Sequence, residues 1–291
     1  MAAVLHDTVA TRPRVAQTIR TPRADVGRWW RFLAVLVITA VVLVPVAVVL
    51  ILALRPGVTS TSTAPVTLEN LTNVFRNTGV LTWLVNSVAV TAATVVVSVA
   101  VAAPAGYVLS RGRSKAVSGY SLLLFVVQSL PVITSVIPLF ILFAKIGLVD
   151  NLVGLGIIYV GGSMSVATWM MAAYMDSIPM SLEQAAWIDG CSPFGGFLRI
   201  VLRNSLPGIL STAIFTFLVA WNDYLVAIVF LRSQQVFTLP IGVESFFQQN
   251  QTDWGSVMAT AVVMMAPPII IFAVLNKYFS VGGIGGSLAG Q

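Results

Sequence analysis

The chain has 291 residues, of which 57% are hydrophobic and only 9% are charged. A soluble domain usually carries about a quarter charged residues, so this composition excludes an ordinary water-soluble fold. The net charge of +6 comes from short basic clusters beside apolar runs, which favours membrane orientation over nucleic-acid binding. With Cys191 and His6 as the single cysteine and histidine, we expect no metal site and no intramolecular disulfide.

The N-terminal part is predicted to contain a tail and one membrane span. Residues 1–28 are polar and rich in Arg, Thr and Pro, and are interpreted as a mobile cytoplasmic tail. Trp29 and Trp30, like Trp83 further on, are interpreted as anchors at the membrane interface. The following apolar run is too long for a signal peptide, so residues 29–79 are assigned to a first transmembrane helix and an outer loop.

Apolar runs of roughly 20 residues, the length that crosses the hydrocarbon layer as a helix, recur along the chain. The predicted fold is all-α and integral to the membrane, with residues 80–280 as its main transmembrane domain and 281–291 as a C-terminal tail. Six spans are expected, at about Arg31 to Leu54, Trp83 to Leu109, Tyr120 to Ala144, Leu152 to Tyr174, Leu206 to Leu231 and Val257 to Phe279.

The distribution of Lys and Arg predicts the orientation, because cytoplasmic loops carry the excess of these residues. Six crossings place both termini on one side. Twelve of the sixteen basic residues then share the side of the termini, and four lie in the opposite loops, namely Arg55, Arg76, Lys145 and Arg232. Both termini are therefore predicted to be cytoplasmic.

A long polar interruption between the fourth and fifth spans carries the most specific pattern. Ser181 and Gln184 fit a capping box at the start of a short helix, and Gly190 suits the left-handed residue that ends it. Ser192 and Pro193 then fit the start of a second helix. The face formed by Leu182, Ala185, Ala186 and Asp189 either packs under the bundle or docks another protein, and patterning alone leaves both interpretations open.

The spacing of this loop resembles that of a known family. Gln184-Ala185-Ala186, three residues, Gly190, nine residues and Ile200-Val201-Leu202 are similar to the EAA loop of ABC importer permeases, whose pattern is EAA, three residues, G, nine residues and I-x-L-P. The wider context resembles the carbohydrate-uptake branch, with its maltose-type permeases, over roughly residues 80 to 290. Two positions differ, since Gln184 replaces the glutamate and Arg203 replaces the proline.

The resemblance implies a division of labour between subunits. Glu183 to Gly190, with Glu183, Gln184, Ala185, Ala186, Asp189 and Gly190 as its functional residues, would be the coupling helix that contacts a dimeric cytoplasmic ATPase. The family also implies a second homologous permease, an extracytoplasmic solute-binding protein or lipoprotein, and a location in a prokaryotic inner membrane. ATP and Mg²⁺ would be bound by the ATPase subunits, and this chain would hold no cofactor.

Polar residues within the spans are candidates for the pathway or for helix packing. Asp223 lies in the expected fifth span beside Asn222, and an intramembrane acid is costly enough to suggest a function. We favour a structural role, hydrogen-bonded to a neighbouring helix or to the partner permease, over contact with substrate. Asn86 and Gln128 offer amide groups that suit either sugar binding or packing between helices.

Alternative functions are less consistent with the sequence. A P-loop requires Gly-Lys before Ser or Thr, whereas the lysines follow Ser114, Ala144 and Asn276, so we expect no ATP site and no enzyme activity in this chain. An ion-driven carrier would be expected to show inverted repeats and several buried ionisable groups. A scaffold or receptor would leave the EAA-like spacing unexplained.

Overall fold

The computed structural model describes residues 27–56, 64–247 and 252–288. The chain divides into two compact units, residues 1–47 and 48–291. The described residues contain no β-strand, and an isolated bridge pairs Phe247 with Thr252. Most of the expected tail, residues 1–28, lies outside the described residues.

The helices are α1 (Arg28–Leu54), α2 (Glu69–Asn77), α3 (Val80–Arg111), α4 (Lys115–Ser129), α5 (Val132–Lys145), α6 (Leu152–Asp176), α7 (Met180–Ile188), α8 (Pro193–Gly196), the π-helix η1 (Phe197–Val201), α9 (Leu202–Asn204), α10 (Leu206–Trp221), α11 (Leu225–Phe230), the 3₁₀-helix η2 (Gln234–Val236), α12 (Leu239–Glu244) and α13 (Trp254–Leu288).

Among the described residues, four helices are long and apolar enough to cross a membrane, and the number rises to six if each of two bent helix pairs counts as one span. The four are α1, α3, α6 and α13. The first, second, fourth and sixth predicted spans therefore correspond to continuous helices. The last of these continues past residue 280, where the tail was expected, to Leu288.

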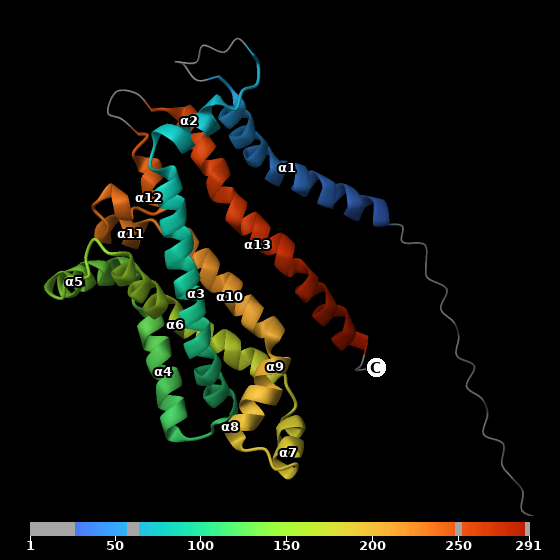
Figure 1. Ribbon diagram of the computed structural model, residues 1–291. Helices are drawn as coiled ribbons and strands as arrows, with labels where there is room; N and C mark the ends of the chain where they lie inside the picture. The colour runs from blue at the N-terminus through green and yellow to red at the C-terminus, as the bar shows by residue number, and fades with distance from the viewer. Residues whose placement is uncertain (1–26, 57–63, 248–251, 289–291) are drawn as a thin grey trace, which may run out of the picture. The chain divides into compact units, whose positions relative to one another are not determined.

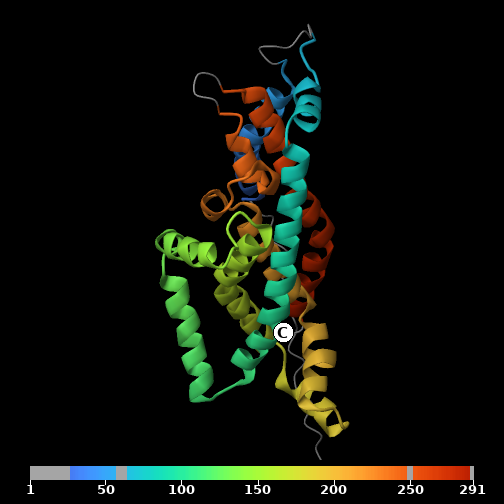
Figure 2. The same cartoon turned by 60° about the vertical axis from the view of Figure 1, so that its left-hand side comes forward.

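The third predicted span is not one straight helix. It consists of α4 and α5, which meet at an angle of 95° across Leu130 and Pro131 (Figure 2). Proline lacks the N–H of a continuing helix and disfavours helical geometry at the residue before it. Leu130 is accordingly extended, with φ −77° and ψ 124°. The apolar run alone could not reveal this bend.

The fifth predicted span is wrong at its C-terminal end. α10 ends at Trp221, and Asp223 lies in the break before α11. The Asp223 carboxylate accepts hydrogen bonds from the backbone N–H groups of Val226 and Ala227, which starts a new helix in place of continuing the old one. The tyrosine hydroxyl of Tyr159 on α6 also donates to this carboxylate, at 2.8 Å.

The expected loop after the first span contains a helix that the sequence analysis did not predict. Asn70 on α2 is buried, and its amide donates to the carbonyl oxygens of Ala53 and Arg55 at 3.0 and 2.7 Å. These carbonyls belong to the C-terminal end of α1, where no intrahelical donor is available. The Asn70 side chain thus supplies the missing donors.

Small residues bring α3 and α6 into close contact, as expected where helices pack in a membrane. A Cβ placed on Gly106 of α3 would lie 2.7 Å from the Met171 Cβ and 2.9 Å from the backbone nitrogen of Ala172 on α6. Nearer the middle of the two helices, the hydroxyl groups of Ser98 and Ser163 lie 3.0 Å apart and are buried. The ribbons of α3 and α6 cross in Figure 1.

The segment that contains η2 and α12 is bound to the first turns of α3. The Trp83 indole donates to the Gln234 carbonyl at 3.1 Å, and the Ser87 hydroxyl accepts from the Leu239 N–H at 2.7 Å. Trp83 is only 3% exposed, so its assignment as an interfacial anchor is wrong. Gly242 permits this packing, because a Cβ there would lie 2.1 Å from the Trp83 ring.

Asp150 fixes the start of the same segment from the α5–α6 connection. Its carboxylate accepts from the backbone N–H groups of Arg232 and Ser233, at 2.8 and 2.9 Å, and from the Ser233 hydroxyl. These bonds, led by the one from the Ser233 hydroxyl, hold the pKa of Asp150 below its ordinary value. Asp150 has a φ of 57°, a left-handed conformation that asparagine also tolerates.

We expect Asp150→Ala to accelerate hydrogen exchange at residues 232–237 by about tenfold, since it removes the acceptor of three hydrogen bonds. Asp150→Asn keeps one acceptor and the left-handed tolerance, so its effect should be smaller. A lowered folded-state pKa means that the wild-type bonds stabilise at neutral pH and are lost as pH falls through that pKa. Hydrogen exchange, corrected for intrinsic rates, should accelerate in the wild type as pH falls through this pKa, but not in Asp150→Asn.

Candidate functional site: the α7–α9 loop

The helix α7 begins at Met180, two residues earlier than the capping-box pattern requires. It follows Pro179, which has φ −58° and ψ 129°, and no side chain caps its first turn. Ser181 therefore lies inside the helix, and the predicted Ser181–Gln184 capping box is wrong. The rigid φ of the proline sets the turn into the helix without a hydroxyl cap.

The second half of the loop begins as the sequence predicts. Gly190 has a φ of +85°, as expected for a left-handed helix end, and the Ser192 hydroxyl accepts from the Gly195 N–H at 3.1 Å. The helix that follows is irregular, because the π-helix η1 lies between α8 and α9. π-helical turns are rare and occur frequently at functional sites.

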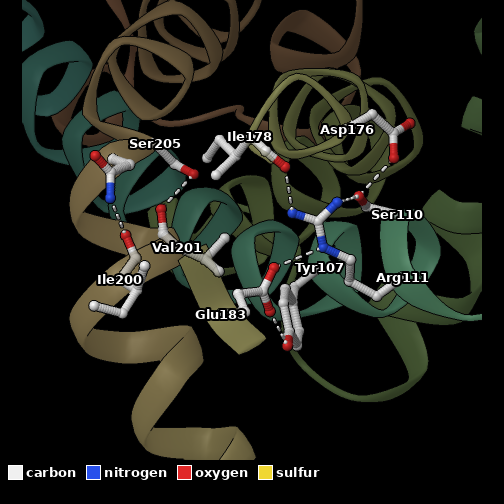
Figure 3. A network of polar contacts seen from close by, with 10 residues as sticks. Tyr107, Ser110, Arg111, Asp176, Ile178, Glu183, Ile200, Val201 and Ser205 are labelled. Carbon is white, nitrogen blue, oxygen red and sulfur yellow. Dashed lines mark hydrogen bonds and ion pairs between the residues drawn. The ribbon is translucent and has the colours of Figure 1, made fainter. Parts of the chain in front are cut away.

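A buried ion pair attaches α7 to the last turn of α3. Glu183 is fully buried, and its carboxylate receives the Arg111 Nε–H at 2.8 Å and the Tyr107 hydroxyl at 2.7 Å. The two α3 side chains point toward Glu183 in Figure 3. Leaving either charge of such a pair alone in a buried site would be costly.

The remaining N–H groups of Arg111 extend the network to the end of α6. Its Nη2 donates to the Ile178 carbonyl at 3.0 Å, and its Nη1 to the Ser110 hydroxyl at 3.3 Å. That hydroxyl in turn donates to Asp176 at 2.6 Å. The guanidinium thus contacts α7, α3 and the α6–α7 junction at once, as Figure 3 shows.

The Tyr107 ring also contacts the second half of the loop. Its centroid lies 4.8 Å from that of Phe197 in η1, and Phe197 packs in a buried cluster with Ala102, Met171 and Val201. Ser205 closes this half by donating to the Val201 carbonyl at 2.7 Å. One residue of α3 therefore holds both halves of the loop.

The opposite face of α7 carries no such contacts to the bundle. Leu182, Gln184, Ala185 and Asp189 are exposed, and Ala186 is partly exposed. Two larger apolar side chains continue the surface, since Ile188 is 86% exposed and Phe194 is 70% exposed. We call the surface formed by Leu182, Ala185, Ile188, Asp189 and Phe194 the loop face.

The other predicted polar residues do not gather with this loop. The Asn86 amide donates hydrogen bonds to the carbonyl oxygens of Gln235 and Phe237, each at 2.9 Å, and so binds α3 to the η2–α12 segment. Asp223 accepts a hydrogen bond from Tyr159 of a neighbouring helix. Asn222 and Gln128 are exposed, the latter next to the α4–α5 bend. The described residues contain no cluster of His, Cys, Asp or Glu that could hold a metal ion.

The arrangement defines a membrane protein whose surface loop is bonded to its spans. Residues 102–281 match the family described as the binding-protein-dependent transport system inner membrane component. The match covers more than half of the chain, so the chain belongs to this family and is a permease subunit of an ABC transporter.

Individual proteins support this assignment. The chain is 34% identical to the probable ABC transporter permease protein YurM of Bacillus subtilis, over 76% of this chain and 74% of that protein. It is 29% identical to the trehalose transport system permease protein SugB of Mycobacterium tuberculosis, over 90% of this chain and 97% of that protein. A chain in the crystal structure of a bacterial ABC transporter involved in alginate import shares the fold, with a TM-score of 0.74, 20% identity and coverage of 89% of this chain and 100% of that chain.

Tyr107 and Arg111 were not predicted from the sequence, although both are central to the contacts of the loop. Arg111 contributed only to the count of basic residues, and Tyr107 lies within an apolar run. A charged residue that closes a long span was the available signal. Its partner Glu183, 72 residues later, could be identified only from the tertiary structure.

Proposed function

We propose that the chain is the permease subunit of an ATP-driven importer for a sugar or a sugar-like solute, and that its α7–α9 loop is the contact with the ATPase. The observation that carries this proposal is the difference between the two sides of α7. Glu183 binds it to α3 on one side, while the loop face is exposed on the other. A helix fixed on one side with small and apolar residues on the other suits docking to a second protein.

The departures at Gln184 and Arg203 have a limited effect in this proposal. Gln184 is exposed and retains a polar side chain that can hydrogen-bond a partner, although it lacks a charge. Arg203 is exposed as well and lies in the helical stretch before α10. That stretch meets α10 at an angle of 72°, although position 203 is not a proline. The docking contact therefore relies on shape and apolar area more than on a salt bridge from position 184.

The other subunits follow from the family. A second homologous permease would complete the pathway, an extracytoplasmic binding protein would deliver solute, and two ATPase subunits would bind ATP and Mg²⁺. With both termini and the loop in the cytoplasm, closure of the ATPases would move the loop and open the pathway outward. The relative named for trehalose supports a carbohydrate as solute. Thermal-shift screening of the co-encoded binding protein against sugars and glycerophosphodiesters tests this class.

Gly190→Val tests the coupling role. Its φ of +85° strains any β-branched residue, although no atom lies within 4 Å of the position of a Cβ. The strain should distort the end of α7 and reduce solute-stimulated ATP hydrolysis by the reconstituted complex by about tenfold or more, given the roughly 1–2 kcal/mol that a left-handed residue costs. The complex should still assemble.

Gly190→Asn serves as the matched control, since asparagine tolerates the left-handed region better than valine. It should retain most of the stimulation. Normal stimulation of both variants would contradict the coupling role of this loop.

A further inference from the structure

Tyr107 and Arg111, near the C-terminal end of α3, contact both halves of the α7–α9 loop. Tyr107 donates to Glu183 of α7 and packs on Phe197 of η1. Arg111 donates to Glu183 and to the Ile178 carbonyl, just before α7. The loop is therefore fixed to a helix that is distant from it in sequence.

The covalent connections of the loop are less suited to transmit a displacement. Ser177, Ile178 and Pro179 separate α6 from α7, and the helical stretch that ends at Asn204 meets α10 at an angle of 72°. Such junctions can absorb movement by small changes in backbone dihedral angles. The Arg111–Glu183 ion pair, at 2.8 Å, and the Tyr107 bond to the same carboxylate, at 2.7 Å, cannot lengthen without leaving a buried charge unpaired.

α3 is also the helix that reaches the opposite end of the fold. Near its N-terminus, Trp83, Asn86 and Ser87 hold the η2–α12 segment through hydrogen bonds. In its middle, Ser98 and Gly106 pack it closely against α6. A displacement applied at Arg111 would thus move α6 and the η2–α12 segment together with α3.

We propose that Tyr107 and Arg111 are positioning residues that transmit the movement of the loop to α3, and through α3 to the η2–α12 segment. The proposal rests on the coupling role of the loop stated above and names the contacts that perform it. Glu183 faces these two residues and is not part of the loop face. The ATPase therefore moves α7, and α3 follows through the Glu183 carboxylate.

Tyr107→Phe and Arg111→Lys test this link with little change in packing. The first removes only the hydroxyl and retains the ring on Phe197. The second keeps the positive charge, but a lysine ammonium cannot reproduce the fork that reaches Glu183, Ser110 and the Ile178 carbonyl together. Both variants keep the loop face unchanged.

The measurement is solute taken up per ATP hydrolysed, in proteoliposomes that contain the complete transporter. We expect this ratio to fall on the order of tenfold in Arg111→Lys and several-fold in Tyr107→Phe, because each loses charge-assisted bonds. ATP hydrolysis should continue, since the ATPase still meets an intact loop face. A role in folding alone would lower the amount of complex and leave the ratio unchanged.

Ser177→Ala is the control, because its hydroxyl binds the Tyr174 carbonyl within the end of α6 and does not reach α3. It should leave the ratio unchanged. A wild-type ratio in both test variants overturns the proposed link; if Gly190→Val still uncouples, the coupling role of the loop survives. If Gly190→Val is also without effect, both proposals fail. Should Arg111→Lys not assemble, the ratio for Tyr107→Phe decides.

Discussion

Arg111→Met is expected to destabilise the permease by about 3–5 kcal/mol, since it leaves the fully buried Glu183 carboxylate without its cation. The remaining bond from the Tyr107 hydroxyl does not neutralise that charge. The midpoint of thermal unfolding in detergent should fall on the order of 10 °C. The yield of monodisperse protein should fall with it.

The double variant Arg111→Met/Glu183→Gln separates the loss of the ion pair from the burial of a lone charge. Glutamine is neutral and can still accept the Tyr107 hydroxyl bond, so most of the stability should return. If the double variant were as unstable as Arg111→Met, the unpaired charge would not be the cause. The packing of the arginine stem would then be the better explanation.

Gly106→Leu should also have a large effect, because the side chain would point into α6. A Cβ alone would lie 2.7 Å from the Met171 Cβ and 2.9 Å from the Ala172 nitrogen, and neither atom is the flexible end of a side chain. The helices must separate, at a cost of about 3 kcal/mol or more. A lower unfolding midpoint and loss of a disulfide between Ser98→Cys and Ser163→Cys, in a Cys191→Ser background, would report this separation.

Gly161→Ala provides the matched control for this prediction. Gly161 lies on α6, and no atom is within 4 Å of the position of its Cβ. Alanine there should be neutral, or should stabilise by about 0.5–1 kcal/mol through helix propensity. If Gly106→Leu were as well tolerated as Gly161→Ala, close packing of α3 on α6 would not be required for stability.

The local pattern of the sequence predicted the features that depend on local chemistry. Long apolar runs predicted α1, α3, α6 and α13, because a span must satisfy its backbone groups within one helix. The left-handed Gly190 and the Ser192 cap were predicted for similar reasons, since each depends on backbone geometry within a few residues. The spacing from Gln184 to Leu202 identified the family that residues 102–281 match.

Hydropathy could not locate the breaks within apolar segments. Leu130 and Pro131 interrupt the third span, and Asp223 begins α11 with its own carboxylate, yet the helices on either side of each break are largely apolar. The Ser181–Gln184 capping box was also consistent with the sequence, but it does not form. Pro179 fixed the helix start instead, because its φ is set by its ring.

By itself the sequence determined that this chain is an all-α membrane protein with an EAA-like loop, because hydropathy and short spacings depend on neighbours along the chain. Only the tertiary structure decided which side of α7 faces the bundle. Glu183 is buried because Arg111 and Tyr107, more than 70 residues earlier, supply its cation and its hydroxyl donor. Such a pairing depends on the packing of α3 against α6, which no local pattern encodes.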